Sequence, residues 1–168
     1  MAKTTVGLVS DTHGWLDPEL VEVFAEHGVD LIVHAGDVGD ESVIDGLEEI
    51  APVHAVRGNI DGGPLRFLPE EELVEVHGRT IAVLHIAGSP RRPKRRALEL
   101  IRREHPDAIV VGHSHIPVVG EVEETLWINP GAAGRQGFHT RRFAAMLHVD
   151  EETGEFSMDR IELDPPES

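Results

Sequence analysis

The sequence has no cysteine, no tyrosine and only two lysines, Lys3 and Lys94. The absence of cysteine excludes disulfide bonds, thiolate metal sites and cysteine nucleophiles, so any metal ion would be held by His, Asp, Glu or Asn. No apolar run approaches the roughly 20 residues that a membrane span requires. The start of the chain also lacks the order of charged, apolar and small residues that marks a signal peptide. We therefore expect a soluble, cytoplasmic protein without a membrane partner.

The charge is strongly one-sided, because 31 Asp and Glu residues outnumber 15 Lys and Arg residues and give a formal net charge of −16. Long-range repulsion disfavours bulk nucleic acid and anionic membrane surfaces as partners. An anionic substrate would need local positive charge, which a metal site can supply. With 168 residues and 40% apolar side chains, the chain is predicted to form one domain, 1–168, around a single core. No pattern defines an oligomeric state.

The first 60 residues alternate between β-branched runs and amphipathic segments. Asp17 and Pro18 are typical of a helix start, and Gly28 of its end. A second helix is indicated by apolar residues that share one face, Val43, Ile44, Leu47 and Ile50. Three predicted strands surround these helices: 4–9, 31–35 and 53–56. Alternating strands and helices predict an α/β fold with parallel strands.

The rest of the chain follows a different pattern. Residues 73–76 and 81–84 predict an antiparallel hairpin, residues 90–104 a helix, and the buried-looking run 108–111 a strand. We expect the last part to form an antiparallel meander and residues 164–168 a terminal tail. The runs that predict the meander are 117–120, 121–129, 142–150 and 155–163.

Side chains that can bind metal ions follow five of the predicted strands. Ligands gather beyond the carboxyl ends of strands in open α/β sheets, so these side chains are expected to meet. Taken singly, the aspartates could be turn or cap residues and the asparagine a residue with left-handed backbone. Taken together, they predict two divalent ions with Asp37 as the bridging carboxylate. The residues are Asp11, His13, Asp37, Asn59, His85, His113 and His115.

These residues also lie in a known order. Asp-x-His, Gly-Asp, Gly-Asn, His and Gly-His-x-His, which begin at Asp11, Gly36, Gly58, His85 and Gly112, resemble the five motifs of the calcineurin-like metallophosphoesterases. The lack of a cap insertion and the sequence Asn-Pro-Gly at 129–131 resemble the small prokaryotic YfcE/MJ0936-type phosphodiesterase branch, which is related to the retromer subunit Vps29. The resemblance implies a four-layer αββα sandwich of two mixed β-sheets flanked by helices.

The resemblance further implies how the ligands divide and what they do. Asp11, His13, Asp37 and His115 would hold one ion, and Asp37, Asn59, His85 and His113 the other. Asp37, Asn59 and His113 are the predicted catalytic residues. Manganese is the expected metal, with iron, zinc, nickel and cobalt as alternatives. The expected activity is hydrolysis of a small phosphodiester by a metal-bridging hydroxide, and the alternative is a metal-free interaction scaffold of the Vps29 type.

Two positions depart from the family pattern. Ile60 stands where many members have a histidine that assists the leaving group, and Ile86 follows His85 where glycine is usual. Without that imidazole, a diester with a good leaving group is the favoured substrate, because it depends less on a protonating acid.

The remaining arginines and histidines are given expected roles from their positions in the sequence. Arg91 and Arg92, from a basic run at 91–96, and Arg135 are predicted substrate contacts, while a solvated face that offsets the acidic chain is the favoured alternative for the run. Most remaining histidines are predicted to be structural, and His34 is the one expected closest to the site. They are His27, His34, His54, His77, His105, His139 and His148.

Overall fold

The computed structural model describes residues 2–137 and 139–164. One five-stranded sheet has the order β10-β9-β1-β2-β3. Strands β1, β2 and β3 are parallel, as predicted, and β9 and β10 are antiparallel to their neighbours. The strands are β1 (Lys3–Val9), β2 (Leu31–His34), β3 (Val53–Ala55), β9 (Arg142–Asp150) and β10 (Phe156–Leu163).

The second five-stranded sheet has the order β4-β5-β6-β8-β7. The predicted hairpin forms from β4 and β5, while β5, β6 and β8 run parallel to one another. The strands are β4 (Glu71–Val76), β5 (Arg79–Leu84), β6 (Ala108–Val111), β7 (Val118–Val122) and β8 (Thr125–Asn129).

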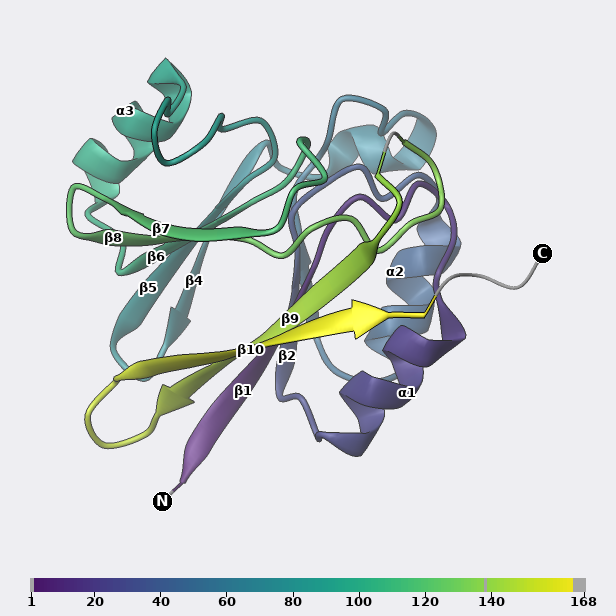
Figure 1. Cartoon of the computed structure of the whole chain (residues 1–168), viewed down its shortest axis with the longest axis horizontal. Coiled ribbons are helices and arrows are strands. Elements are labelled where there is room, and N and C mark those ends of the chain that lie inside the picture. The colour runs from purple at the N-terminus through teal and green to yellow at the C-terminus, as the bar shows by residue number, and fades with distance from the viewer. Residues whose placement is uncertain (1, 138, 165–168) are drawn as a thin grey trace.

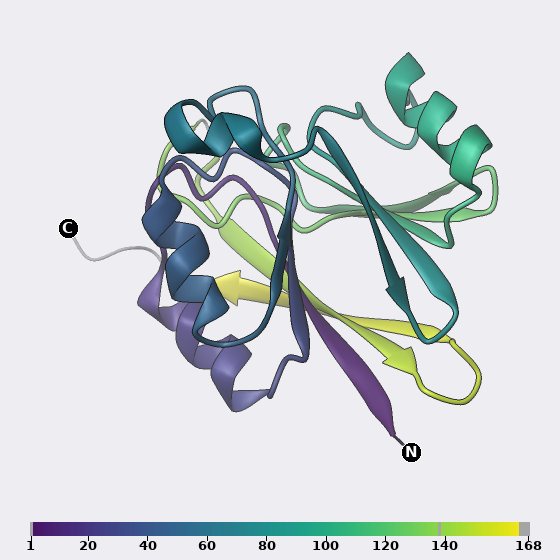
Figure 2. The same cartoon turned by 180° about the vertical axis from the view of Figure 1, so that it is seen from behind.

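Helices cover the outer face of each sheet. Helices α1 (Pro18–Glu26) and α2 (Glu41–Glu48) lie against the first sheet, and α3 (Arg95–Glu104) lies against the second (Figures 1 and 2). A short 3-10 helix, Gly63–Phe67, precedes β4. The predicted four-layer αββα arrangement is confirmed. No helix in the described part of the chain is long and apolar enough to cross a membrane.

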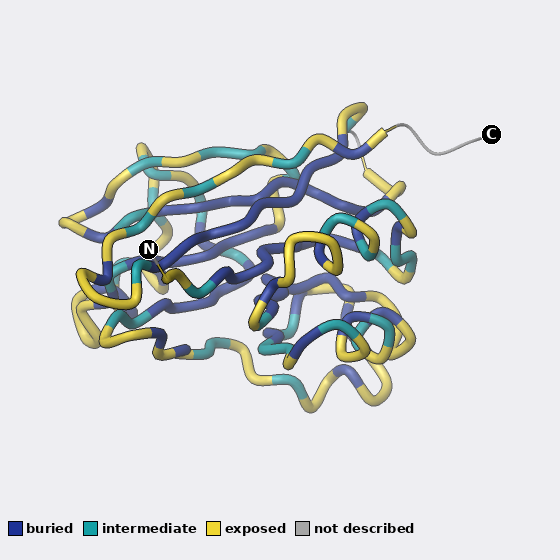
Figure 3. Tube along the Cα trace, turned by 90° about the horizontal axis from the view of Figure 1, so that it is seen from below, coloured by how far each residue is buried: buried dark blue, intermediate teal, exposed yellow. Residues whose placement is uncertain are grey.

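Side-chain alternation along the strands produces three apolar layers. On β6, Ala108 and Val110 face the first sheet, whereas Ile109 and Val111 pack with residues of α3 such as Leu100. All four β6 residues are fully buried, which explains why this strand is a continuous apolar run rather than an alternating one. Figure 3 shows buried strands surrounded by exposed loops.

The predicted helix 90–104 is too long, because α3 begins only at Arg95. Proline at 93 lacks an N–H and disfavours helical backbone at Arg92. The segment instead forms a turn, in which Arg92 N donates to Ser89 O at 3.1 Å. Lys94 has extended backbone immediately before the helix.

The predicted C-terminal meander is wrong. Strands β7 and β8 join the second sheet, with β8 parallel to β6, whereas β9 crosses to the first sheet and pairs with β1 and β10. The β7–β8 turn lies at Glu123 and Glu124, which have positive φ, rather than after Gly120. The local sequence pattern indicates that a segment forms a strand, but it does not indicate the strand with which the segment pairs. That pairing depends on which sheet edge is free. The expected tail beyond Asp164 lies outside the described residues.

A buried ion pair joins the helix layer to β9. Arg142 Nη1 donates to Asp17 Oδ2 at 2.6 Å and to Ala133 O at 3.1 Å. Asp17 also caps α1, as predicted, because its Oδ1 accepts from Glu19 N at 2.9 Å. Arg142 and Asp17 are 5% and 6% exposed, so each charge depends on the other for compensation.

We expect Arg142→Met to lower the free energy of unfolding by about 3–5 kcal/mol, because the Asp17 carboxylate stays buried without its cation. Urea denaturation at fixed metal concentration measures the change. The double variant Asp17→Asn/Arg142→Met should recover part of the loss, since a neutral amide still caps α1. An unchanged urea midpoint for the single variant would contradict this prediction.

Candidate metal centre

The predicted ligands meet where the carboxyl ends of strands from both sheets converge. Two groups of side chains form there, and within each group one ligand atom per residue lies within 4.8 Å of the others. We call Asp11, His13 and His115 the first group, and Asp37, His85 and His113 the second group. The assignment of these residues as ligands stays a prediction, but the structure brings all of them together.

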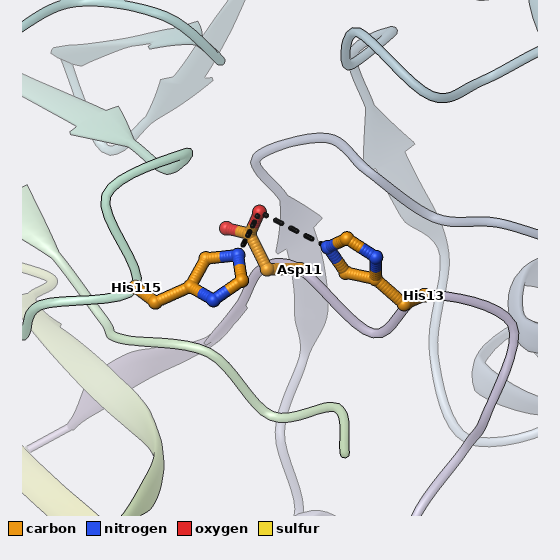
Figure 4. Close-up of side chains that lie close together, drawn as sticks. All are labelled: Asp11, His13 and His115. Carbon is orange, nitrogen blue, oxygen red and sulfur yellow. Dashed lines mark ion pairs between the residues drawn. The ribbon is translucent and has the colours of Figure 1, made fainter. Parts of the chain in front are cut away.

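The first group surrounds one carboxylate oxygen. Asp11 Oδ1 lies 3.2 Å from His115 Nε2 and 3.7 Å from His13 Nε2 (Figure 4). The other oxygen, Oδ2, accepts hydrogen bonds from Ser10 Oγ at 2.6 Å and from His113 N at 3.1 Å. The carboxylate is therefore held by Oδ2 and presents Oδ1 to the two imidazoles.

Two atoms of this group lack partners. Asp11 Oδ1 and His13 Nε2 are buried and have no hydrogen-bond partner among the described residues. An unsatisfied buried polar atom costs about 1–3 kcal/mol, and a cation between these atoms would satisfy both. Carboxylate and imidazole donors suit divalent manganese, iron, zinc, nickel or cobalt. The residues present thus fit a metal ion.

Asp37 faces both groups. Its Oδ1 lies 3.3 Å from His85 Nε2, and its Oδ2 lies 3.5 Å from His13 Nε2. Asn59 belongs with the second group, because its Oδ1 lies 2.9 Å from His85 Nε2 and 3.0 Å from His113 Nδ1. The division of ligands that the family resemblance implies stays a prediction, with Asp37 placed to contact both groups.

Hydrogen bonds orient the imidazoles. His85 Nδ1 donates to Ala35 O at 2.7 Å, which leaves its Nε2 toward Asp37. His139 Nε2 donates to Gly134 O at 2.9 Å, so its Nδ1 accepts the bond from His115 Nδ1, also at 2.9 Å. In a neutral ring this leaves the lone pair of His115 on Nε2, which faces Asp11.

His139 is the residue that sequence reasoning missed, because it was predicted to be structural only. The loop that carries it begins at Asn129, which is anchored to the other site loop. Asn129 Nδ2 donates to Ser114 Oγ at 3.1 Å and to Gly112 O at 3.3 Å. Apart from that Asn-Pro-Gly start, no local signal pointed to His139.

Most of the predicted ligands have strained backbone. Left-handed backbone costs a non-glycine residue on the order of 1–3 kcal/mol and clusters at functional sites. Backbone bonds hold the conformation, since Asp11 N donates to Gly36 O and His13 N to Asp37 O, both at 3.0 Å. The left-handed ligands have φ between 49° and 73°: Asp11, His13, Asp37, His113 and His115.

Glycines in the Gly-Asp and Gly-Asn motifs permit close approach. A Cβ on Gly36, which has φ of 101°, would lie 2.6 Å from the ring of His85. A Cβ on Gly58 would lie 2.1 Å from Asp37 Oδ1. Larger residues at these two positions would displace a predicted ligand. This explains why both motifs have glycine there.

Asp61 joins the loops that follow β2 and β3. Its carboxylate accepts from three backbone N–H groups, those of Gly58 at 2.7 Å, Gly39 at 2.9 Å and Val38 at 3.2 Å. These bonds fix Asn59 relative to Asp37. Because its oxygens are engaged, Asp61 is a structural clamp rather than a replacement for the histidine absent at Ile60.

Carboxylates and imidazoles shift one another's pKa values. Burial by itself would raise the pKa of Asp11, but the neighbouring His115 and His13 outweigh it and hold that pKa well below its usual range. Asp11 raises the pKa of His13. Burial opposes a charge on His85, yet Asp37 and Asp11 raise its pKa. The centre therefore attracts positive charge, whether protons or metal ions.

His34 lies beneath the site and stays neutral. Its Nδ1 accepts from Gly36 N at 3.1 Å and its Nε2 donates to Thr12 Oγ1 at 3.0 Å. Thr12 Oγ1 in turn donates to Val38 O at 2.9 Å. Complete burial lowers the pKa of His34 to about 4. The expectation that His34 lies close to the site is thus met by its contacts with the site loops.

The basic residues divide between the surface and a cavity. Arg91 and Arg92 are exposed in the turn before α3, and Arg135 lies with its guanidinium carbon 4.2 Å from the ring centre of Trp15. None of the three lines the cavity of about 560 Å³ beside Asn59 and His85. Their roles as substrate contacts stay predictions.

Comparison with known proteins identifies the family. Residues 5–152 match the calcineurin-like phosphoesterase superfamily domain. The chain belongs to this family.

Two sequence relatives are named as a metallophosphoesterase and a phosphodiesterase, and a solved structure shares the fold. The probable metallophosphoesterase MJ0623 of Methanocaldococcus jannaschii is 35% identical over 133 residues, which cover 76% of this chain and 67% of that protein. The phosphodiesterase MJ0936 of the same organism is 28% identical over 149 residues, 75% of this chain and 82% of the relative. Zinc-complexed Vps29 from Entamoeba histolytica shares the fold, with a TM-score of 0.74, 19% identity, and coverage of 95% and 99%.

His34 predicts a pH-dependent stability. The pKa of His34 is about 4 in the folded protein against 6.5 when the side chain is exposed. Its contribution to the free energy of unfolding is therefore complete above pH 6.5 and is lost as pH falls toward 4. As the pH falls from about 7 to about 5, we expect the free energy of unfolding of the metal-free protein to decrease by about 2 kcal/mol more than that of the His34→Gln variant. Denaturant titrations with chelator present measure both proteins. Equal pH slopes would contradict the neutral, buried state of His34.

His139→Ala should weaken metal binding at the first group by about 10- to 100-fold, because His115 loses the partner that orients it. Isothermal titration with Mn²⁺ measures the affinity. His27→Ala is the matched control, since this exposed histidine at the end of α1 lies outside both groups. The predicted role of His139 is wrong if both variants bind Mn²⁺ as the unmodified protein does.

Proposed function

We propose that this phosphoesterase is a dinuclear metal-dependent phosphodiesterase that hydrolyses a small phosphodiester. The observation that carries the proposal is the position of Asp37, whose two oxygens face different ligand groups. Family membership and the phosphodiesterase named among the relatives support the reaction class. A preference for manganese, a cytoplasmic location and the absence of bulk nucleic-acid binding belong to the same proposal.

Divalent ions at the two groups would supply an activated water and positive charge for the phosphoryl oxygens. The chain's own part is to hold the donors in place. Asp37 links the two groups, because its two oxygens face His13 and His85. Asn59 contacts His85 and His113 and fixes their relative orientation. Bonds to backbone and to His139 keep the imidazole nitrogens directed inward, so little rearrangement is needed when substrate binds.

The surroundings of Asn59 favour a diester with a good leaving group. Ile60 is 45% exposed and offers no proton, while the Asp61 carboxylate accepts three backbone bonds. Neither residue can protonate an alkoxide. The aryloxide of an aryl diester leaves without that help, because its oxygen is much less basic than that of an alkoxide.

The alternative function is a metal-free interaction scaffold, which the shared fold with Vps29 keeps open. The enzyme is the better-supported function, because each group has three side chains that could bind a metal ion. Asp11 Oδ1, which is buried and has no hydrogen-bond partner among the described residues, would also lower the stability of a scaffold without serving its function.

Manganese-loaded protein should hydrolyse bis(p-nitrophenyl) phosphate, and a chelator should abolish the activity. We expect Asp37→Ala to lower kcat/KM by about 100-fold or more, because both groups lose a shared oxygen donor. Asp45→Ala, which removes an exposed carboxylate of α2, is the matched control and should leave kcat/KM unchanged. Folded protein that neither retains metal nor hydrolyses the diester would leave the scaffold function as the better account.

A further inference from the structure

We propose that the cavity beside Asn59 and His85 binds an anionic group carried by one ester substituent of the substrate. The preferred substrates are then phosphodiesters that bear a second phosphate at a distance from the reacting one. This inference rests on the proposed function and adds the substrate class to it. We call this hollow the cationic cavity.

The cationic cavity adjoins the second group. Its volume is about 560 Å³, within the range of cavities that hold small organic ligands. Asn59 and His85 form one part of its wall and Lys94 and Arg96 another, so a single ligand can reach both. The lining residues are Arg57, Gly58, Asn59, Asp61, Glu70, Leu84, His85, Ile86, Lys94 and Arg96.

The balance of charge in this wall is opposite to that of the chain. Arg57 and Arg96 both pair with Glu70, with Arg96 Nη1 2.8 Å from Glu70 Oε2, and Arg96 Nη2 also lies 3.7 Å from Glu71 Oε2. Arg96 lowers the pKa of Glu70, which therefore remains charged. The Asp61 carboxylate is directed to backbone amides. The lining therefore has three cations, Arg57, Lys94 and Arg96, against two carboxylates, Glu70 and Asp61, in a chain whose net charge is −16.

Lys94 is the cation available to a ligand. Among the described residues, no carboxylate oxygen lies within 4.0 Å of its ammonium. Its backbone N donates to Ala87 O at 2.8 Å, and its side chain makes no cap bond to α3. The turn before Pro93 therefore fixes the base of the side chain and leaves the ammonium free to contact an anion. An ammonium is a common phosphate donor in proteins.

The apolar part of the wall fits the organic portion of such a substituent. Leu84 is buried and Ile86 is partly buried, and both line the same cavity as His85, Lys94 and Arg96. A ring or sugar against these side chains would place its outer phosphate toward Lys94 and Arg96. The cavity is consistent with a two-phosphate ligand rather than with inorganic phosphate alone.

Two chromogenic diesters test the inference: thymidine 5′-(p-nitrophenyl phosphate) and the same compound with a 3′-phosphate. Both release p-nitrophenolate, so kcat/KM can be compared directly in manganese-loaded protein. We expect the 3′-phosphate to raise kcat/KM by about tenfold, the factor typical of one charge-assisted hydrogen bond. In Lys94→Ala this advantage should disappear, chiefly through KM.

Arg95→Ala is the matched control, because it removes the same charge from the neighbouring residue. Arg95 is 92% exposed by its side chain, pairs with Glu99 and lies outside the cationic cavity. It should keep the full preference for the 3′-phosphate. Equal losses in both variants would assign the effect to general electrostatics and overturn the inference.

The two proposals fail in distinguishable ways. Hydrolysis of both diesters with no preference, or with a preference against the 3′-phosphate, would overturn the inference and leave the proposed function in place. The second result is what repulsion by an acidic chain alone would produce. If neither thymidine diester is hydrolysed while bis(p-nitrophenyl) phosphate is, the inference is overturned and the proposed function stands. If folded, metal-loaded protein hydrolyses none of the three diesters, the proposed function fails and the substrate class fails with it.

Discussion

The burial of the Asp11 carboxylate is the constraint on which the rest of the structure depends. A fully buried carboxylate is tolerated only with hydrogen bonds and compensating positive charge. Ser10 and His113 N supply the bonds, while His13 and His115 provide the neighbouring imidazoles. Since these partners come from strand ends of both sheets, satisfying one charge aligns the two halves of the sandwich. A metal ion bound between these side chains would stabilise the same contacts.

The strained backbone follows from the same constraint. Side chains on several strands can converge on one point only if the chain turns sharply as each strand ends, and five of the predicted ligands accordingly have left-handed backbone. Gly36 and Gly58 remove the Cβ atoms that would separate the loops. Asp61 then binds backbone N–H groups of two loops. The strain is borne by residues whose position the chemistry requires.

Prediction from sequence was accurate where the determining interactions are local. Asp17 caps α1 through a bond to Glu19 N, and the apolar run at 108–111 is a strand buried on both faces. It failed where partners are distant. Nothing local distinguishes a meander from a β9 strand that crosses to β1, and nothing near His139 indicates contact with His115. The basic run was recognised, but the turn at Pro93 directs Lys94 and Arg96, rather than Arg91 and Arg92, to the cavity.

The sequence by itself determined the class of the protein: ordered strand-end motifs without cysteine predict a metal centre built from carboxylate, amide and imidazole donors. Only the tertiary structure shows how near these donors lie to one another. Asp37 faces both groups with its two oxygens, and Asn59 Oδ1 lies close to His85 and His113. It also shows which cations line the cavity beside Asn59 and His85. Residue types follow from local chemistry, whereas distances and orientations arise only when strands far apart in the chain pack together.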